Sequence, residues 1–275
     1  MTLSAKEGPH HETLFLEVGG GDANNFTSQI DTFKKNKGIH TVLGFSGGAD
    51  DDTPLLNHLR GKIETFGKTD KRKKVYRKIL DDSGKEYVAG IVRSILRELR
   101  PARAREGNSP IAILTGGTSW GVPDVATRVA KELGFTTIGV FPLTAKTKGN
   151  VLPLDLLDLA VCVHPFIYSS QWGDEAPIYT KLLDNVVVIG GNAGTMVEVA
   201  HVLKLNERKD VMTKHILPVY GTGGTADKLS FFPGKPKIMA KCIPSHPLTS
   251  GEEVLQYLKD NILSDEDYDQ TEKET

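Results

Sequence analysis

The chain contains seven short, almost continuously apolar runs. Most of them are separated by segments in which apolar residues recur at every third or fourth position. Such runs are typical of strands that are covered on both faces, as in a parallel sheet, because a half-exposed strand alternates apolar and polar residues. The seven runs are Leu14–Val18, His40–Phe45, Ile111–Thr115, Thr137–Phe141, Leu159–His164, Val186–Ile189 and Ile216–Tyr220.

The segments between these runs carry the end signals of amphipathic helices. Thr53-Pro54 combines a capping residue with a proline at the first helical position. Pro101 follows one periodic segment closely, and Gly134 follows another as a typical C-terminal glycine. The predicted helices are Leu55–Phe66, Tyr87–Leu99, Pro123–Leu133, Thr195–Leu205 and Glu252–Ile262.

The alternation of strands and helices predicts the fold class. Strand–helix–strand units of this length form right-handed crossovers, so we expect an α/β fold with a doubly wound, mostly parallel, Rossmann-like sheet. No internal repeat or low-complexity linker divides the chain, and we expect one domain over residues 13–263. Residues 1–12 and 264–275 have too little apolar content to pack and are expected to be flexible.

Composition and charge narrow the classes of partner. The formal net charge of -1 gives no general reason to expect nucleic acid or a membrane surface as a partner, and no run approaches the length of a membrane span. Only Cys162 and Cys242 are present, which argues against a disulfide framework or a thiolate metal site. We therefore expect a cytoplasmic protein without a bound metal.

Two charged segments leave alternatives open. The basic segment Lys68–Lys78 reads as a solvated helix or loop, or else as a patch for phosphate or an anionic partner. The acidic triplet Asp50-Asp51-Asp52 reads as a solvated loop, or else as an attractor of a divalent cation. In both cases the solvated interpretation is favoured, because the basic segment has one tyrosine but no stacking platform, and the acidic triplet has no spaced ligands elsewhere.

Four of the apolar runs lead directly into glycine-rich turns. In a parallel sheet the carboxyl ends of the strands meet at one edge, where ligands bind. Glycine allows a ligand close to the backbone, and the free N–H groups at a following helix start attract phosphate. These turns therefore predict a phosphate-compatible cleft. The turns are Gly44–Gly48, Gly116–Gly121, Gly190–Thr195 and Gly221–Thr225.

Named catalytic and nucleotide motifs are not matched well. The chain has neither the phosphate loop of P-loop NTPases nor the GxGxxG fingerprint with a downstream acidic residue. Gly44–Gly48 satisfies GxSxG, the nucleophile elbow of α/β-hydrolases, with His215 or His246 as a possible base. The elbow requires a helix directly after the serine, but the acidic triplet intervenes, so the hydrolase interpretation is disfavoured.

The segment from Gly190 to Glu198 resembles the GGxxGTxxE signature of the SLOG superfamily, which includes LOG-type phosphoribohydrolases and DprA-like proteins. The block Ile111–Pro142 is similar to the strand, Gly-Gly turn, helix and strand that form its other hallmark. The combination with Phe45–Ala49 is closest to the LSDAT branch, which includes a cytosolic region of melastatin-type TRP channels. The resemblance covers roughly residues 41 to 225.

The resemblance implies a site that holds a phosphate and a ribose of a nucleotide-derived ligand. Glu198 matches the glutamate that acts in N-glycosidic cleavage in LOG enzymes, although a structural role within its own helix is an equal alternative. Trp172 is a candidate for stacking on a base or ribose, and packing is its alternative role. The implied phosphate-loop and facing-wall residues are Ser46, Gly47, Gly48, Gly116, Gly117, Thr118, Gly121, Gly190, Gly191, Asn192, Gly194 and Thr195.

Two function classes follow from these observations. LOG enzymes carry an arginine on the helix before the motif, whereas residues 169–186 contain no arginine, and their one lysine is Lys181. The leading hypothesis is therefore binding or sensing of a nucleotide-derived ligand such as ADP-ribose or an NAD derivative. The alternative is a LOG-like phosphoribohydrolase acting on a nucleoside monophosphate. Relatives of this kind are commonly dimers, so a homo-oligomer is expected.

Overall fold

The structure of the chain is a computed structural model, which describes residues 13–19, 23–48, 64–65, 71–99, 110–165 and 169–263. Side chains are described for these ranges except at residues 23–24 and 74–81. The predicted helix Leu55–Phe66, apart from its residues 64–65, lies outside the described residues. The acidic triplet at 50–52, the first three residues of the basic segment at 68–70 and both termini also lie outside them.

All seven predicted strands are present, and they form one seven-stranded parallel sheet in the order β1-β5-β4-β3-β2-β6-β7. β3, β4, β5 and β6 are buried at every residue, as expected of strands covered on both faces. One domain over residues 13–263 remains a prediction from the sequence. The strands are β1 (Leu14–Val18), β2 (Thr41–Gly47), β3 (Ile111–Thr115), β4 (Thr136–Pro142), β5 (Leu159–Val163), β6 (Asn185–Ile189) and β7 (His215–Val219).

One face of the sheet is covered by helices whose apolar side chains form a continuous core with the strands. Phe26, Ile30 and Phe33 of the first helix pack there, and Val199 and Val202 contribute from the helix after β6. These helices are α1 (Ala23–Lys37), α6 (Ala176–Leu182), α7 (Ala193–Asn206), α8 (Gly224–Lys228) and α9 (Pro236–Cys242), with the short 3-10 helix η3 (Leu229–Phe231) after α8.

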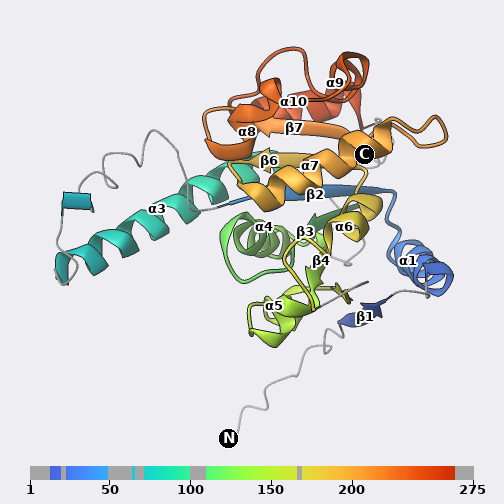
Figure 1. Cartoon of the computed structure of the whole chain (residues 1–275), viewed down its shortest axis with the longest axis horizontal. Coiled ribbons are helices and arrows are strands. Elements are labelled where there is room, and N and C mark those ends of the chain that lie inside the picture. Colours follow the sequence, from blue (N-terminus) through green and yellow to red (C-terminus); the bar gives the residue numbers. More distant parts are fainter. Residues whose placement is uncertain are drawn as a thin grey trace, which may run out of the picture.

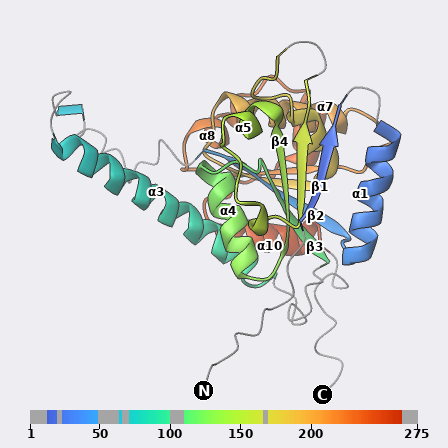
Figure 2. The same ribbon diagram turned by 90° about the horizontal axis from the view of Figure 1, so that it is seen from below.

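The other face is covered by a second set of helices and carries its own core. α3 extends well beyond the sheet on one side (Figures 1 and 2), while Val92, Ile95 and Leu96 near its end are buried against α4 and α10. The helices are α3 (Lys71–Leu96), α4 (Gly121–Glu132), α5 (Leu143–Thr147) and α10 (Gly251–Asn261), with the 3-10 helix η2 (Leu154–Leu156) after α5. The molecule is thus an α/β, Rossmann-like fold.

The helix predictions were less accurate than those for the strands. α3 begins at Lys71, so the expected helix Tyr87–Leu99 is only its second half, and the helix ends at Leu96. Serine and glycine at positions 83 and 84 weaken helix propensity, but packing of the later turns stabilises the continuous helix. α1 was not predicted, because its few apolar positions are embedded in a polar sequence.

Candidate ligand-binding site

A pocket of about 500 Å³ lies at the carboxyl ends of the central strands β3, β2 and β6. β2 pairs with β3 on one side and with β6 on the other, so the chain changes direction across the sheet at this point. Ligands of open α/β sheets bind at such switch points. The pocket is lined by Phe45, Ser46, Gly47, Gly48, Gly116, Thr118, Trp120, Gly121, Pro123, Trp172, Gly173, Glu175, Asn192, Ala193, Gly194, Thr195, Val197 and Glu198.

Most of the residues proposed from the sequence meet in this pocket. All but Trp172, which precedes α6, and Glu198, which lies within α7, come from the carboxyl ends of β2, β3 and β6 and the turns and helix starts that follow them, which the parallel strand order brings together. The proposed residues that line it are Ser46, Gly47, Gly48, Gly116, Thr118, Gly121, Trp172, Asn192, Gly194, Thr195 and Glu198.

Gly117, Gly190 and Gly191 do not line the pocket. The carbonyl of Gly117 accepts a hydrogen bond from the Leu152 amide at 2.9 Å, and the Gly190 amide donates to the Thr222 hydroxyl at 2.8 Å. The carbonyl of Gly191 accepts from the Thr225 amide at 2.8 Å. These glycines hold the turns against neighbouring segments, and Thr118 and Asn192, which follow Gly117 and Gly191, line the pocket.

Two helices begin at the pocket without a capping side chain. α4 follows Trp120 and α7 follows Asn192, and neither of these residues accepts a hydrogen bond from the first turn of its helix. The amide groups of a helix start are donors without intrahelical partners, and the helix dipole adds positive potential there. The starts of α4 and α7 can therefore bind an anionic group such as phosphate. No lysine or arginine is among the described residues that line the pocket.

Glu198 provides one of the two carboxyl groups, with Glu175, among the described residues that line the pocket. It accepts a hydrogen bond from the hydroxyl of Ser46, which is buried at the end of β2. The pKa of Glu198 is raised to about 8: burial raises it most, the Ser46 hydrogen bond partly opposes the rise, and the nearby charge of Glu175 adds to it. The carboxyl is therefore mostly protonated at neutral pH and can donate a hydrogen bond to a ligand.

Two residues near Glu198 were not predicted from the sequence. Glu175 accepts a hydrogen bond from the Gly173 amide at 2.8 Å, and burial raises its pKa. The hydroxyl of Tyr179 is fully buried without a hydrogen-bond partner among the described residues, and burial together with the charge of Glu198 raises its pKa. Tyr179 belongs to the hydrophobic core and lies on the buried side of α6. Its position in the sequence does not indicate that its hydroxyl is close to Glu198.

An aromatic wall closes one side of the pocket. Trp120 and Trp172 are each 45% exposed, and their ring centroids lie 5.3 Å apart in an edge-to-face arrangement. Trp172 was proposed from the sequence, whereas Trp120 was overlooked although it stands directly before Gly121 in a predicted turn. Exposed tryptophans at the rim of a pocket offer flat surfaces on which a base can stack.

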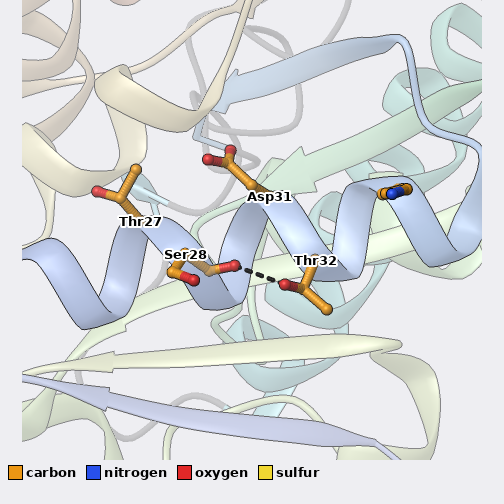
Figure 3. Close-up of a pocket in the computed structure, with 5 residues that line it drawn as sticks. Thr27, Ser28, Asp31 and Thr32 are labelled. Atoms are coloured by element: carbon orange, nitrogen blue, oxygen red, sulfur yellow. Dashed lines mark hydrogen bonds between the residues drawn. The ribbon is translucent and has the colours of Figure 1, made fainter.

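A second hollow lies along α1 (Figure 3) and has a different character. It is lined by Thr27, Ser28, Asp31, Thr32 and Lys35, all on one helix, and Thr32 donates a hydrogen bond to the Ser28 carbonyl at 2.8 Å. A single helix cannot enclose a ligand, so the glycine-lined pocket is the candidate site.

None of the described helices is both long and apolar enough to cross a membrane.

Comparisons with solved structures found distant likenesses. The molybdenum cofactor carrier protein of Chlamydomonas reinhardtii is 20% identical with a TM-score of 0.44, over 79% of this chain and 95% of that chain. The molybdenum cofactor binding protein of the phototrophic bacterium Rippkaea orientalis is 21% identical with a TM-score of 0.44, over 81% of this chain and 98% of that chain. DNA processing protein A of Streptococcus pneumoniae is 15% identical with a TM-score of 0.41, over 80% of this chain and 62% of that chain.

At these identities and scores the likenesses say nothing about what this chain binds. A comparison with curated proteins found no match. Residues 104–223, less than half of the chain, match the model of the SLOG cluster4 family. Through this segment the chain is similar to the SLOG cluster4 family, which supports the superfamily resemblance seen in the sequence and does not confirm the LSDAT branch.

Proposed function

We propose that the chain binds a nucleotide-derived ligand in the glycine-lined pocket, with ADP-ribose-like or NAD-derived molecules as the favoured class. The observation that carries this proposal is the combination, in one pocket, of two uncapped helix starts and two exposed tryptophans. The helix starts supply donors for phosphate, and the tryptophans supply a stacking surface. Binding requires only such preformed groups.

The charge of the pocket is compatible with a phosphate although its described lining includes no lysine or arginine. A protonated Glu198 does not repel an anion, and its pKa of about 8 keeps most of it neutral at physiological pH. Backbone amides then suffice as donors, as in other phosphate sites at helix starts. The expectations of a homo-oligomer, a cytoplasmic location and no nucleic-acid partner remain proposals beside this one.

Ligand titrations with the purified full chain test the proposal. Thermal unfolding would be followed with AMP, ADP, ADP-ribose, cyclic ADP-ribose and NAD, because a ligand at 100 times its dissociation constant stabilises a fold by about 2.7 kcal/mol. An increase in Tm with intact ligand supports binding. If none of these compounds changes the Tm, the nucleotide proposal is wrong.

We expect Trp120→Ala and Trp172→Ala each to weaken binding of the best ligand roughly 5- to 150-fold. Stacking of one base on an aromatic side chain contributes about 1–3 kcal/mol, which corresponds to that range. Isothermal titration calorimetry measures the change. Phe231→Ala is the matched control, since Phe231 is 86% exposed and does not line the pocket. Unchanged affinity in both tryptophan variants would exclude the aromatic wall from the site.

A second candidate function is hydrolysis of the N-glycosidic bond of a nucleoside monophosphate. The observation that favours it is the protonated carboxyl of Glu198 in the pocket, since a group with a pKa near the working pH is suited to general acid catalysis. Chromatography of the same incubations would detect a released base. Release that disappears in Glu198→Gln while the nucleotide still binds would establish the enzyme over the binding protein.

A further inference from the structure

Three side chains with metal-binding atoms converge at the carboxyl ends of β1 and β5. The ligand atoms of Glu17, Cys162 and His164 all lie within 4.8 Å of one another. Glu17 is the register partner of Cys162 in the parallel pair. His164 lies two residues after Cys162, so that its side chain points to the same face of the sheet. The His164 amide also donates to the Val18 carbonyl at 2.7 Å, which continues the pairing beyond the strand ends.

The surroundings orient these groups toward one another. Cys162 is fully buried in a small core beneath α5, together with Phe141 and Ala145. Lys146 of α5 donates to one carboxylate oxygen of Glu17 (Oε1) at 2.7 Å. The other oxygen, Oε2, lies 3.4 Å from Nε2 of His164. Within the described part of the chain this Nε2 is buried and makes no hydrogen bond.

We propose that Glu17, Cys162 and His164 bind a divalent transition-metal ion of borderline softness, with Zn²⁺ as the best fit. Thiolate, imidazole and carboxylate together suit Zn²⁺, whereas Mg²⁺ and Ca²⁺ prefer sites made of oxygen ligands alone. Three protein ligands leave the fourth tetrahedral position to water. On binding, the Cys162 thiol loses its proton to solvent, and the thiolate and the carboxylate then balance the charge of the ion.

This site is separate from the glycine-lined pocket. None of its three residues lines that pocket, and β4 stands between β5 and β3 in the sheet. β1 is an edge strand whose described partner is β5 alone. A bound ion therefore ties the end of the edge strand to the body of the sheet. The site could not be predicted from the sequence, because Glu17 meets the other two ligands only through the pairing of β1 with β5.

Titration of the full chain with Co²⁺ tests the proposal. The chain is used reduced and without an affinity tag, and Co²⁺ serves as a spectroscopic substitute for Zn²⁺. We expect one equivalent of Co²⁺ to give a near-ultraviolet charge-transfer band from a thiolate, which excess Zn²⁺ removes. The band should be absent in Cys162→Ser, and His164→Ala and Glu17→Gln should each weaken Co²⁺ binding at least tenfold.

Two controls make the result decisive. Cys242→Ser alters the other buried free cysteine and should leave the band unchanged. A variant with His10→Ala and His11→Ala removes the histidine pair of the N-terminal sequence, and should also retain it. If Cys162→Ser does not fold, as judged by circular dichroism, the His164 and Glu17 variants carry the test. No thiolate band, a band lost in Cys242→Ser, or full affinity in both other ligand variants would overturn the proposal.

Discussion

Glu198→Gln is expected to reduce a decline in stability that the wild-type chain shows as the pH rises from 4.5 toward 8. The ordinary pKa of a glutamate is 4.5, and that of Glu198 in the folded chain is about 8. Between these values the folded chain keeps a proton that the unfolded chain has released, so the free energy of unfolding falls with rising pH. The slope for one such group is at most about 1.4 kcal/mol per pH unit.

Glutamine keeps the shape of the side chain and can still accept the hydrogen bond from Ser46, but it does not titrate. The variant should therefore equal or exceed the wild type in stability above neutral pH, and the difference between them should grow with pH. Urea unfolding at several pH values between 5 and 8 measures both slopes.

Glu253→Gln is the matched control for this experiment. Hydrogen bonds from the Thr249 amide and hydroxyl lower the pKa of Glu253, so its contribution to stability is lost only below its ordinary value of 4.5. The control should consequently follow the wild-type slope between pH 5 and 8. If the free energy of unfolding depends on pH in the same way in the wild type and in Glu198→Gln, Glu198 is ionised in the folded chain. That result would rule out the acid role proposed for Glu198.

The pH experiment also bears on ligand choice. A carboxyl that is neutral near pH 7 and charged above pH 8 makes the pocket less favourable for an anion at alkaline pH. Affinity for a phosphate-bearing ligand should accordingly decline over the same range in the wild type and remain flat in Glu198→Gln. The folding and binding measurements thus depend on the same proton, and agreement between them would place the phosphate near Glu198.

The strands and the cleft could be predicted from the sequence because both depend on local patterns. Val186–Ile189 and Ile111–Leu114 are continuously apolar, and a turn rich in glycine lies shortly after each of them. Parallel strands then bring the turns to one edge of the sheet whatever the strand order is. For this reason Ser46, Thr118 and Asn192 could be assigned to one pocket before the order of the strands was known.

Features that depend on which strands are neighbours could not be predicted. Glu175 and Tyr179 approach Glu198 only because α6 packs beside α7. Glu17 meets Cys162 only because β1 pairs with β5, which follows it by four strands along the chain. No local spacing encodes either contact. The length of α3 was missed for a related reason, since packing of its later turns against α4 and α10 stabilises a helix whose central residues are weak helix formers.

Gly224→Ala is expected to destabilise the fold strongly and to abolish ligand binding. Gly224 has φ of +57°, which strains any other L-residue, and a Cβ atom there would overlap the carbonyl oxygen of Gly191. That oxygen accepts the hydrogen bond from the Thr225 amide, so the two backbones are already in close contact. The overlap would be between backbone atoms of two turns, which cannot move aside as the end of a flexible side chain can. We expect a loss of about 3 kcal/mol or more.

Ligand binding should fail because the displaced turn after β6 forms part of the pocket. Gly191 immediately precedes Asn192, whose carbonyl accepts a hydrogen bond from the Thr225 hydroxyl at 3.0 Å. Any displacement of the Gly191 carbonyl therefore moves the start of α7, where phosphate is proposed to bind. Urea unfolding measures the stability, and calorimetry with the best ligand from the thermal screen measures the binding.

Gly149→Ala separates backbone strain from steric overlap. Gly149 has φ of +67°, close to that of Gly224, but a Cβ atom added there would meet no atom within 4 Å. The control should lose only the strain of a left-handed residue, about 1–2 kcal/mol, and should keep its ligand affinity. Equal losses of stability in the two variants would mean that the turn after β7 can move to accommodate a Cβ atom. The contact between Gly224 and Gly191 would then not be what positions the start of α7.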